Sequence, residues 1–363
     1  MTLLESTVEP TDDRPVFEPL GGIIEPRWWT GVPWLSPDDY VIDAAGFDLE
    51  ADIHPNSSLA ARMREVYDRS GIVLVTSTGL SDLGRMRALA KLVVPAEMDY
   101  DGGSNPRQHI EPNVYEVGAP HSAWLHYHHE MAYVGRTTRA VGFLCRAALP
   151  AGRGRTFVSD SVAATDALLS TDFGQKLEEL GLCYHRNLTD REAFSGRVEI
   201  GVYNHWQRSF GTEDRREAVE RAQAVGLETD WDANGLLRTR YHASAFEYFP
   251  QLDRNLLFSS VADHGMWFDT WPLVQHLPYA NRPLDLTFGD GTPFRRDELQ
   301  QFVDVYDRFG TPIDWNVGDV AVICNHRFAH GRPAIHLAEG EQRELGVVLG
   351  GDAERVGVRP AAW

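Results

Sequence analysis

Histidine and carboxylate side chains are concentrated in one short segment of the sequence, WLHYHHEM, at residues 124–131. If this segment is a strand, successive side chains point to opposite faces. His126, His128 and Glu130 would then share one face, and His129 would point to the other. An imidazole and a carboxylate that neighbour each other on one face can bind one metal ion from adjacent coordination positions. The segment therefore predicts part of a metal site.

A third ligand has to come from elsewhere in the chain, and a second histidine-rich segment, NHRFAHGR, occupies residues 325–332. It offers His326 and His330. Two histidines and one carboxylate form the facial triad of non-haem iron(II) oxygenases, which leaves coordination positions open for a cosubstrate and oxygen. The helical HExxH pattern of zinc hydrolases is absent from the sequence. A zinc hydrolase of another type and a non-catalytic jelly-roll binding protein remain alternatives, as does a chance His-x-Glu in a plain structural setting.

The elements that must position these segments are mostly short apolar runs separated by glycine and proline. These runs favour strands at Ile72–Thr76, Ala140–Ala147, Leu182–Asn187, Val320–Cys324 and Leu345–Leu349. Helical patterns occupy residues 59–70, with a capping segment at 56–58 and a stop at Gly71, and begin again at Ser81. Further helical patterns cover Asp166–Leu180, Arg215–Ala224 and Arg296–Phe309.

Strands that occur early and late, with helices inserted between them and no βαβ alternation, predict an antiparallel barrel or jelly roll. An ordinary α+β domain is the alternative that periodicity leaves open. Residues 1–15 are acidic and contain proline, which predicts a flexible N-terminal tail. We expect residues 16–363 to form a single domain.

The composition limits the classes of partner. The 363 residues contain 34 Lys plus Arg against 53 Asp plus Glu, a formal net charge of −19. Such a surface repels phosphate backbones and anionic lipids, so we expect no nucleic-acid and no membrane partner. The acidic start has no signal-peptide pattern, and the three cysteines are widely spaced. These features favour the cytoplasm and a small-molecule substrate, with a homo-oligomer left open.

Several motifs occur in one order along most of the chain, and together they resemble the TauD/TfdA family, in its clavaminate-synthase-like and SyrP-like branch. The first is His128 to Tyr133, which is similar to the branch's His-x-Glu-Met-x-Tyr box. The others are Arg155–Ser161, Trp206–Thr212, Gly235–Arg240, Phe288–Pro293, Trp315–Val320 and Asn325–Arg332. The resemblance implies a mainly β (α+β) fold with a double-stranded β-helix (jelly-roll, cupin-like) core and helical insertions. It also implies Fe(II), 2-oxoglutarate and O2 as cofactors.

The resemblance also assigns roles to residues of this sequence. His128, Glu130 and His330 match the iron ligands, which selects His330 over His326. Thr156 and Arg343 match the pair that binds the distal carboxylate of 2-oxoglutarate, for which a hydroxyl and a forked guanidinium are suited. Because Glu130 is present, halogenation is disfavoured. The implied activity is oxidation, most simply hydroxylation, of an unactivated C–H bond in an amino-acid-like metabolite. That metabolite is free or tethered to a carrier protein, in natural-product (antibiotic) biosynthesis; desaturation, cyclisation and epoxidation are the alternatives.

Other positions depart from the family pattern or stay ambiguous. Cys324 stands where relatives carry Asp, so the support of His330 is expected to differ. Val347 replaces a second arginine, which leaves Arg343 and Thr156 as the clamp. His126 is either a substrate contact or a hydrogen-bonded core histidine, and His326 is expected to be solvated. Trp267 and Phe268 are candidates for the wall of the substrate pocket.

Overall fold

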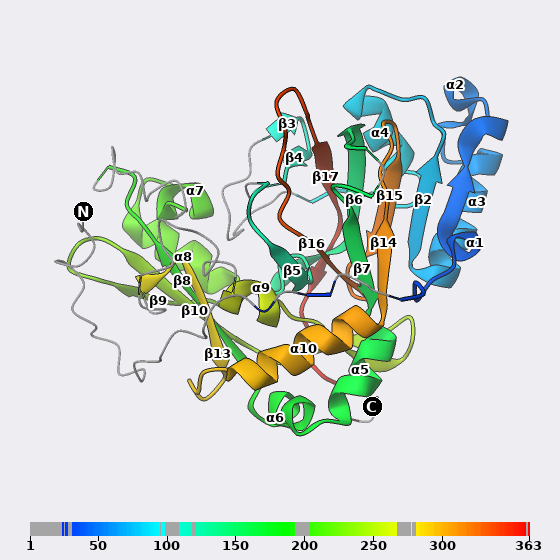
Figure 1. The fold of residues 1–363 in the computed structure, drawn as a ribbon. Helices are drawn as coiled ribbons and strands as arrows, with labels where there is room; N and C mark the ends of the chain where they lie inside the picture. The colour runs from blue at the N-terminus through cyan, green and yellow to red at the C-terminus, as the bar shows by residue number, and fades with distance from the viewer. Residues whose placement is uncertain are drawn as a thin grey trace.

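The computed structural model describes residues 31–94, 96–98, 109–117, 121–150, 152–192, 204–266, 281–360 and 362–363, together with residues 24, 26, 27 and 277. The tail predicted at residues 1–15 lies outside the described residues. Figure 1 shows a body of two packed sheets, in which α3 and α4 lie on the outer side of the larger sheet, and a smaller lobe built from a third sheet. Within the described part of the chain, no helix is long and apolar enough to cross a membrane.

The larger sheet forms the back of the main body. Its seven strands lie in the order β1 (Val41–Asp43), β2 (Ile72–Thr76), β15 (Val320–Cys324), β6 (Arg136–Ala147), β17 (Glu344–Glu354), β4 (Val114–Glu116) and β3 (His109–Glu111). Two helices cover it: α3 (Ser58–Ser70) packs on β2 and β15, and α4 (Leu83–Ala90) packs on β15 and β6. The short α1 (Pro37–Tyr40) and the 3-10 helix Ala44–Gly46 contact β2, and α2 (Leu49–Asp52) contacts α3. Four of the five side chains of β2 are buried, as expected of a strand between a helix layer and a second sheet.

The smaller sheet of the main body carries most of the candidate site. Its order is β14 (Gly310–Ile313), β7 (Thr156–Asp160), β16 (Phe328–Arg332) and β5 (Leu125–His128), all antiparallel. It faces the larger sheet, because the ring of Phe143 on β6 lies 5.4 Å from the ring of His330 on β16. The two facing sheets form the jelly-roll core that was expected.

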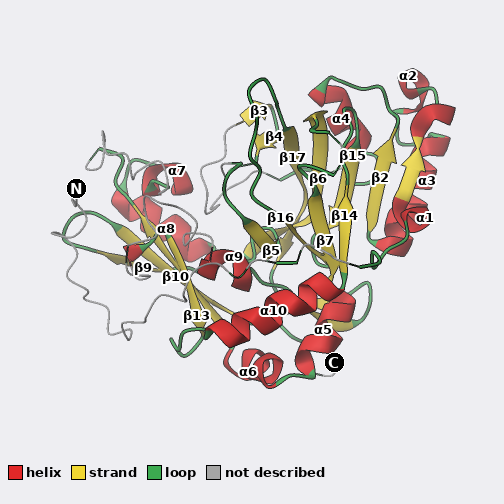
Figure 2. Cartoon of the chain, viewed as in Figure 1, coloured by secondary structure: helices red, strands yellow, loops and turns green. Residues whose placement is uncertain are grey.

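Helices and a third sheet make up the insertions (Figure 2). The third sheet has the order β13 (Leu284–Phe288), β8 (Leu182–Leu188), β10 (Leu237–Ala243) and β9 (Glu228–Trp231), and β11 (Phe246–Phe249) pairs with β12 (Arg254–Leu257). The inserted helices are α5 (Ser161–Leu169), α6 (Asp172–Leu180), α7 (Trp206–Phe210), α8 (Arg215–Ala224), α9 (Val261–Met266) and α10 (Arg296–Arg308). In α10, Leu299, Phe302, Val303 and Tyr306 are buried at helical spacing, so this helix presents one apolar face to the core.

Most predicted elements are confirmed within a few residues, but the single helix predicted over Asp166–Leu180 is wrong. The chain forms two helices there, α5 and α6, which are separated at Ser170 and Thr171. The hydroxyl of Thr171 accepts a hydrogen bond from the backbone N–H of Gly174 at 3.0 Å, and so caps the second helix. A Cβ at residue 174 would lie 1.9 Å from the carbonyl oxygen of Leu168, so this turn requires glycine.

Candidate metal centre

The two histidine-rich segments are brought together as neighbouring strands of the smaller sheet. His128 is the last residue of β5, and its Cα is the register partner of His330 on β16. The two imidazole rings lie 4.3 Å apart between centroids. Gly331 permits this approach, since a Cβ at that position would lie 2.6 Å from the backbone oxygen of Leu125. A bulge in the pairing follows at Arg332.

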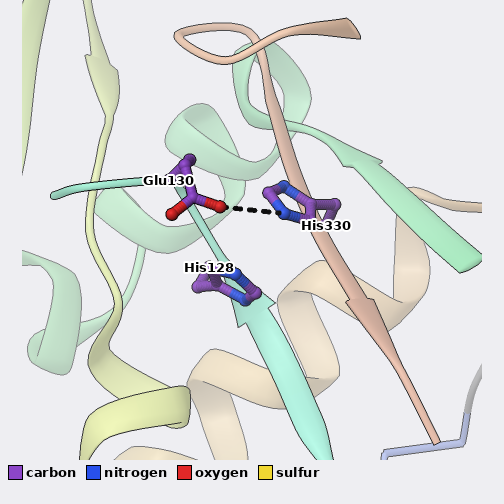
Figure 3. Close-up of side chains that lie close together, drawn as sticks. All are labelled: His128, Glu130 and His330. Carbon is purple, nitrogen blue, oxygen red and sulfur yellow. Dashed lines mark ion pairs between the residues drawn. The ribbon is translucent and has the colours of Figure 1, made fainter. Parts of the chain in front are cut away.

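His128, Glu130 and His330 form one cluster of ligand atoms (Figure 3). Each offers one nitrogen or oxygen, and these atoms lie within 4.8 Å of one another. Nε2 of His330 is 4.0 Å from Oε2 of Glu130, too far for a hydrogen bond. Two ligand atoms that each lie roughly 2.1 Å from one metal ion are at most about 4.2 Å apart. The spacing of this pair therefore suits a metal ion between them.

The hydrogen bonding of His128 leaves one ring nitrogen available to bind a metal ion. Its Nδ1 lies 2.8 Å from the backbone oxygen of His126, an acceptor, so Nδ1 carries the proton. The lone pair is then on Nε2. A hydrogen bond of this kind fixes the tautomer and the ring orientation of metal-binding histidines.

His129 points away from the cluster, as alternation along the strand predicted. Its Nδ1 accepts a hydrogen bond from the backbone N–H of Ser259 at 3.1 Å, and its Nε2 lies 2.9 Å from the hydroxyl of Ser161. Complete burial lowers the pKa of His129 to about 3, so the ring is neutral. Glu130 lies beyond the end of β5, in a turn, yet a carboxylate oxygen of its side chain lies close to the ring of His128.

Thr156 and Arg343 line the same cavity as the three clustered residues. Nη2 of Arg343 lies 3.5 Å from the hydroxyl oxygen of Thr156, and its Nε donates to the backbone oxygen of Gly154 at 2.8 Å. Arg343 is 6% exposed, and among the described residues no carboxylate lies within 4.0 Å of its guanidinium. Burial lowers its pKa to about 10, which leaves it charged at neutral pH. A buried cation of this kind favours an anionic ligand.

Arg332 is a second buried guanidinium in this cavity, and sequence reasoning did not single it out. Burial, followed by the charge of Arg343, lowers its pKa to about 9. One nitrogen of Arg332 donates to the backbone oxygens of His121 and Ala123, at 3.0 and 2.7 Å. Strand alternation from His330 would have placed residue 332 on the same face, so the signal was present in the sequence.

The remaining candidates have different environments. His126 is completely buried, with its pKa lowered to about 3 by burial, and is not among the residues that line the cavity. The expectation that His326 is solvated holds only in part, because the residue is half-buried. Its ring stacks between Phe258 and Phe249, at centroid distances of 4.9 and 5.8 Å. Trp267 and Phe268 lie outside the described residues.

Comparison with known proteins gives one family match and one curated relative. Residues 34–349 match the family described as taurine catabolism dioxygenase TauD, TfdA family. A clavaminate synthase-like protein of Arabidopsis thaliana is 28% identical over 242 residues, which is 65% of this chain and 69% of the relative.

Solved structures with a similar chain trace include a taurine dioxygenase from Burkholderia xenovorans. It has a TM-score of 0.49 and 16% identity, with 89% of each chain covered. Another is the crystal structure of AAD-2 in complex with Mn(II) and N-oxalylglycine, with a TM-score of 0.47 and 14% identity. That match covers 87% of this chain and 95% of the other.

Proposed function

Because this chain belongs to the taurine catabolism dioxygenase TauD, TfdA family, we propose that His128, Glu130 and His330 hold its iron(II), and that Arg343 and Thr156 hold its 2-oxoglutarate. The protein is an iron(II)- and 2-oxoglutarate-dependent dioxygenase. When bound, iron, 2-oxoglutarate and oxygen together supply the oxidising power that breaks an unactivated C–H bond, with succinate and CO2 as coproducts.

The observation that carries the assignment is that all five residues line one cavity. Two imidazoles and one carboxylate on one side match the donor set that iron(II) takes in this class of enzyme, and leave positions open for other ligands. On the other side, the guanidinium of Arg343 and the hydroxyl of Thr156 are adjacent. A dicarboxylate that reaches from the cluster to this pair would receive charge-assisted hydrogen bonds at its far end.

The protein's part in the reaction is to hold and orient. The hydrogen bond from His128 to the oxygen of His126 keeps Nε2 directed at the metal position. Arg343 would fix where the far carboxylate of the cosubstrate binds, because its own Nε is anchored on the backbone oxygen of Gly154. The side chains of Phe143, Leu345 and Val347 line the cavity and exclude water from the reacting atoms.

We further propose hydroxylation of an amino-acid-like small metabolite, free or bound to a carrier protein, in natural-product biosynthesis. A second cavity, of about 530 Å³, is the candidate place for the substrate: none of the five assigned residues lines it, but its wall includes Met131, the residue after Glu130. Its size lies within the range of small-molecule sites. Apolar side chains such as Phe210 line it, together with Arg136 and Asp352, which form an ion pair with each other at its wall. Desaturation, cyclisation or epoxidation would use the same residues, and identification of the product separates these outcomes.

The test begins with the cosubstrate complex in the absence of oxygen. Wild-type protein mixed anaerobically with Fe(II) and 2-oxoglutarate should show a weak visible charge-transfer band, and the H128A variant should lack it. If the wild type has no such band, or if H128A retains it, the assignment is wrong. Succinate release in air, measured across a panel of free and carrier-bound amino acids, then tests the substrate class. Activity with Zn(II) and without oxygen would favour a hydrolase instead.

A further inference from the structure

We propose that Asn325 is a positioning residue for the metal carboxylate, because its side-chain amide fixes the backbone of Glu130 from both sides. The inference rests on the proposed function, in which Glu130 is a metal ligand. It differs from the role that the family resemblance implies for the preceding residue, Cys324, which is the support of His330. The structure connects Asn325 with the other ligand segment.

The contacts of Asn325 use both ends of its amide. Oδ1 accepts a hydrogen bond from the backbone N–H of Glu130 at 2.7 Å, and Nδ2 donates to the backbone oxygen of Glu130 at 2.9 Å. Nδ2 also donates to the backbone oxygen of Thr138 at 2.9 Å. The hydroxyl of Thr137 donates to the same oxygen of Glu130 at 2.9 Å. Asn325 and Thr137 are completely buried, so water does not compete for these groups.

Glu130 needs this support because it lies outside regular structure. β5 ends at His128, and Glu130 is the start of a turn. The next residue, Met131, has a φ of 58°, a left-handed backbone conformation that residues other than glycine, asparagine and aspartate rarely adopt. Such a conformation persists where the surrounding structure holds it. The amide of Asn325 and the hydroxyl of Thr137 hold the residue that immediately precedes it.

The same residue also couples the two ligand segments. Asn325 directly follows β15 and lies in the turn that leads into β16, which carries His330. Its backbone N–H donates to the oxygen of Arg139 on β6 at 2.9 Å. A shift of Glu130 relative to His330 would therefore break the side-chain hydrogen bonds of Asn325. The amide of asparagine carries an acceptor oxygen and a donor NH2 on one short planar group, which matches the N–H and C=O of a single backbone residue.

The chain offers a matched control in Asn255, which makes the same kind of clamp far from the cluster in sequence. Its Oδ1 accepts from the backbone N–H of Arg359 at 2.8 Å, and its Nδ2 donates to the oxygen of Arg359 at 2.8 Å. Asn255 is also completely buried. Asn325→Ala and Asn255→Ala therefore remove equivalent hydrogen bonds, and only the first is expected to affect the metal site.

The experiment measures the dissociation constant of Mn(II) for the full chain without oxygen or substrate, by electron paramagnetic resonance of the free ion. We expect Asn325→Ala to raise this constant about tenfold to a hundredfold, the usual effect of losing a group that orients a ligand. Asn255→Ala should stay within about twofold of the wild type, although thermal unfolding should show both variants to be less stable. In Co(II)-loaded protein, the visible absorption should change for Asn325→Ala alone.

Equal constants for the two variants would overturn the inference, whether both are weakened or both are unchanged. If Asn325→Ala does not fold, Thr137→Val replaces it. This variant keeps the side-chain shape and removes one hydrogen bond to Glu130, so a rise of several-fold is expected and an unchanged constant contradicts the inference. Failure of the wild type to bind Mn(II) would instead show that the assigned metal centre is wrong, and the inference would fall with it.

Discussion

The guanidinium of Arg343 lies beside the hydroxyl of Thr156, with 3.5 Å between Nη2 and Oγ1, although the two residues are attached to strands of different sheets. Thr156 begins β7 of the smaller sheet, and Arg343 directly precedes β17 of the larger one. The contact therefore spans the jelly-roll core at the cavity that also contains His128, Glu130 and His330. It places one cationic donor and one hydroxyl side by side in this cavity, at the end where we propose that the cosubstrate binds.

Arg343→Gln should weaken the binding of 2-oxoglutarate. Loss of a charge-assisted pair costs about 1.5–3 kcal/mol, which is roughly a tenfold to hundredfold rise in the dissociation constant. The constant is measured by anaerobic titration of the Fe(II) protein. Arg155→Gln is the matched control, because Arg155 precedes Thr156 but pairs with Asp314 at the surface. Equal affinities for the Arg343 variant and the control would exclude the clamp.

Thr156→Val should weaken 2-oxoglutarate binding several-fold and also lower stability. Its hydroxyl accepts a hydrogen bond from Nε1 of Trp315 at 3.0 Å, and the valine leaves that buried donor without its acceptor. An unsatisfied buried donor costs about 1–3 kcal/mol. Thr156→Ser keeps the hydroxyl, so its cosubstrate affinity and unfolding midpoint should lie near those of the wild type. If the serine variant binds as poorly as the valine variant, the hydroxyl is not the group that matters.

Much of this arrangement could be predicted from the sequence, because it follows from local rules. Alternation separated His129 from His128, and the apolar runs predicted β2 and β15 at their observed boundaries. Alternation also grouped His126 with His128 and Glu130, but β5 ends at His128 and His126 does not line the cavity. The fold of the chain was likewise predictable, since it belongs to a family whose motifs occur in order along the sequence.

The features that could not be predicted depend on residues distant in the sequence. The polar character of His326 suggested solvent, but packing places its ring between Phe249 and Phe258. Asn325 was predicted only as the first residue of the segment that carries His330, and its contact with Glu130 requires the turn after β5 to meet the turn after β15. No local periodicity contains that information.

Gly331→Ala should disrupt the metal centre without changing any ligand. The added Cβ would lie 2.6 Å from the oxygen of Leu125 and 2.9 Å from the carbonyl carbon of His126, and these are backbone atoms of β5. The strand has to move away, which separates His128 from His330. We expect at least a tenfold loss of Mn(II) affinity and a lower unfolding midpoint, since overpacking of this kind costs about 1–3 kcal/mol. Gly46→Ala, where a Cβ meets nothing within 4 Å, is the control.

His326 makes stability depend on pH. Burial, and then the charges of Arg355 and Arg139, lower its pKa from 6.5 to about 4. The unfolded chain therefore takes up a proton at this residue near pH 6.5, while the folded protein does not until about pH 4. Its contribution to stability is present above pH 6.5 and is lost progressively as the pH falls towards 4, by at most about 1.4 kcal/mol per pH unit.

The variant His326→Phe tests this, because a phenyl ring can stack between Phe249 and Phe258 but does not titrate. Urea unfolding at pH 7, 6 and 5 should show a shallower loss of stability for the variant than for the wild type. The difference should be smallest at pH 7 and should grow at each step, since each step protonates a larger fraction of the unfolded wild-type chain. Parallel curves for the two proteins would mean that His326 is protonated equally in the folded and unfolded states, and its burial would then have no effect on its pKa.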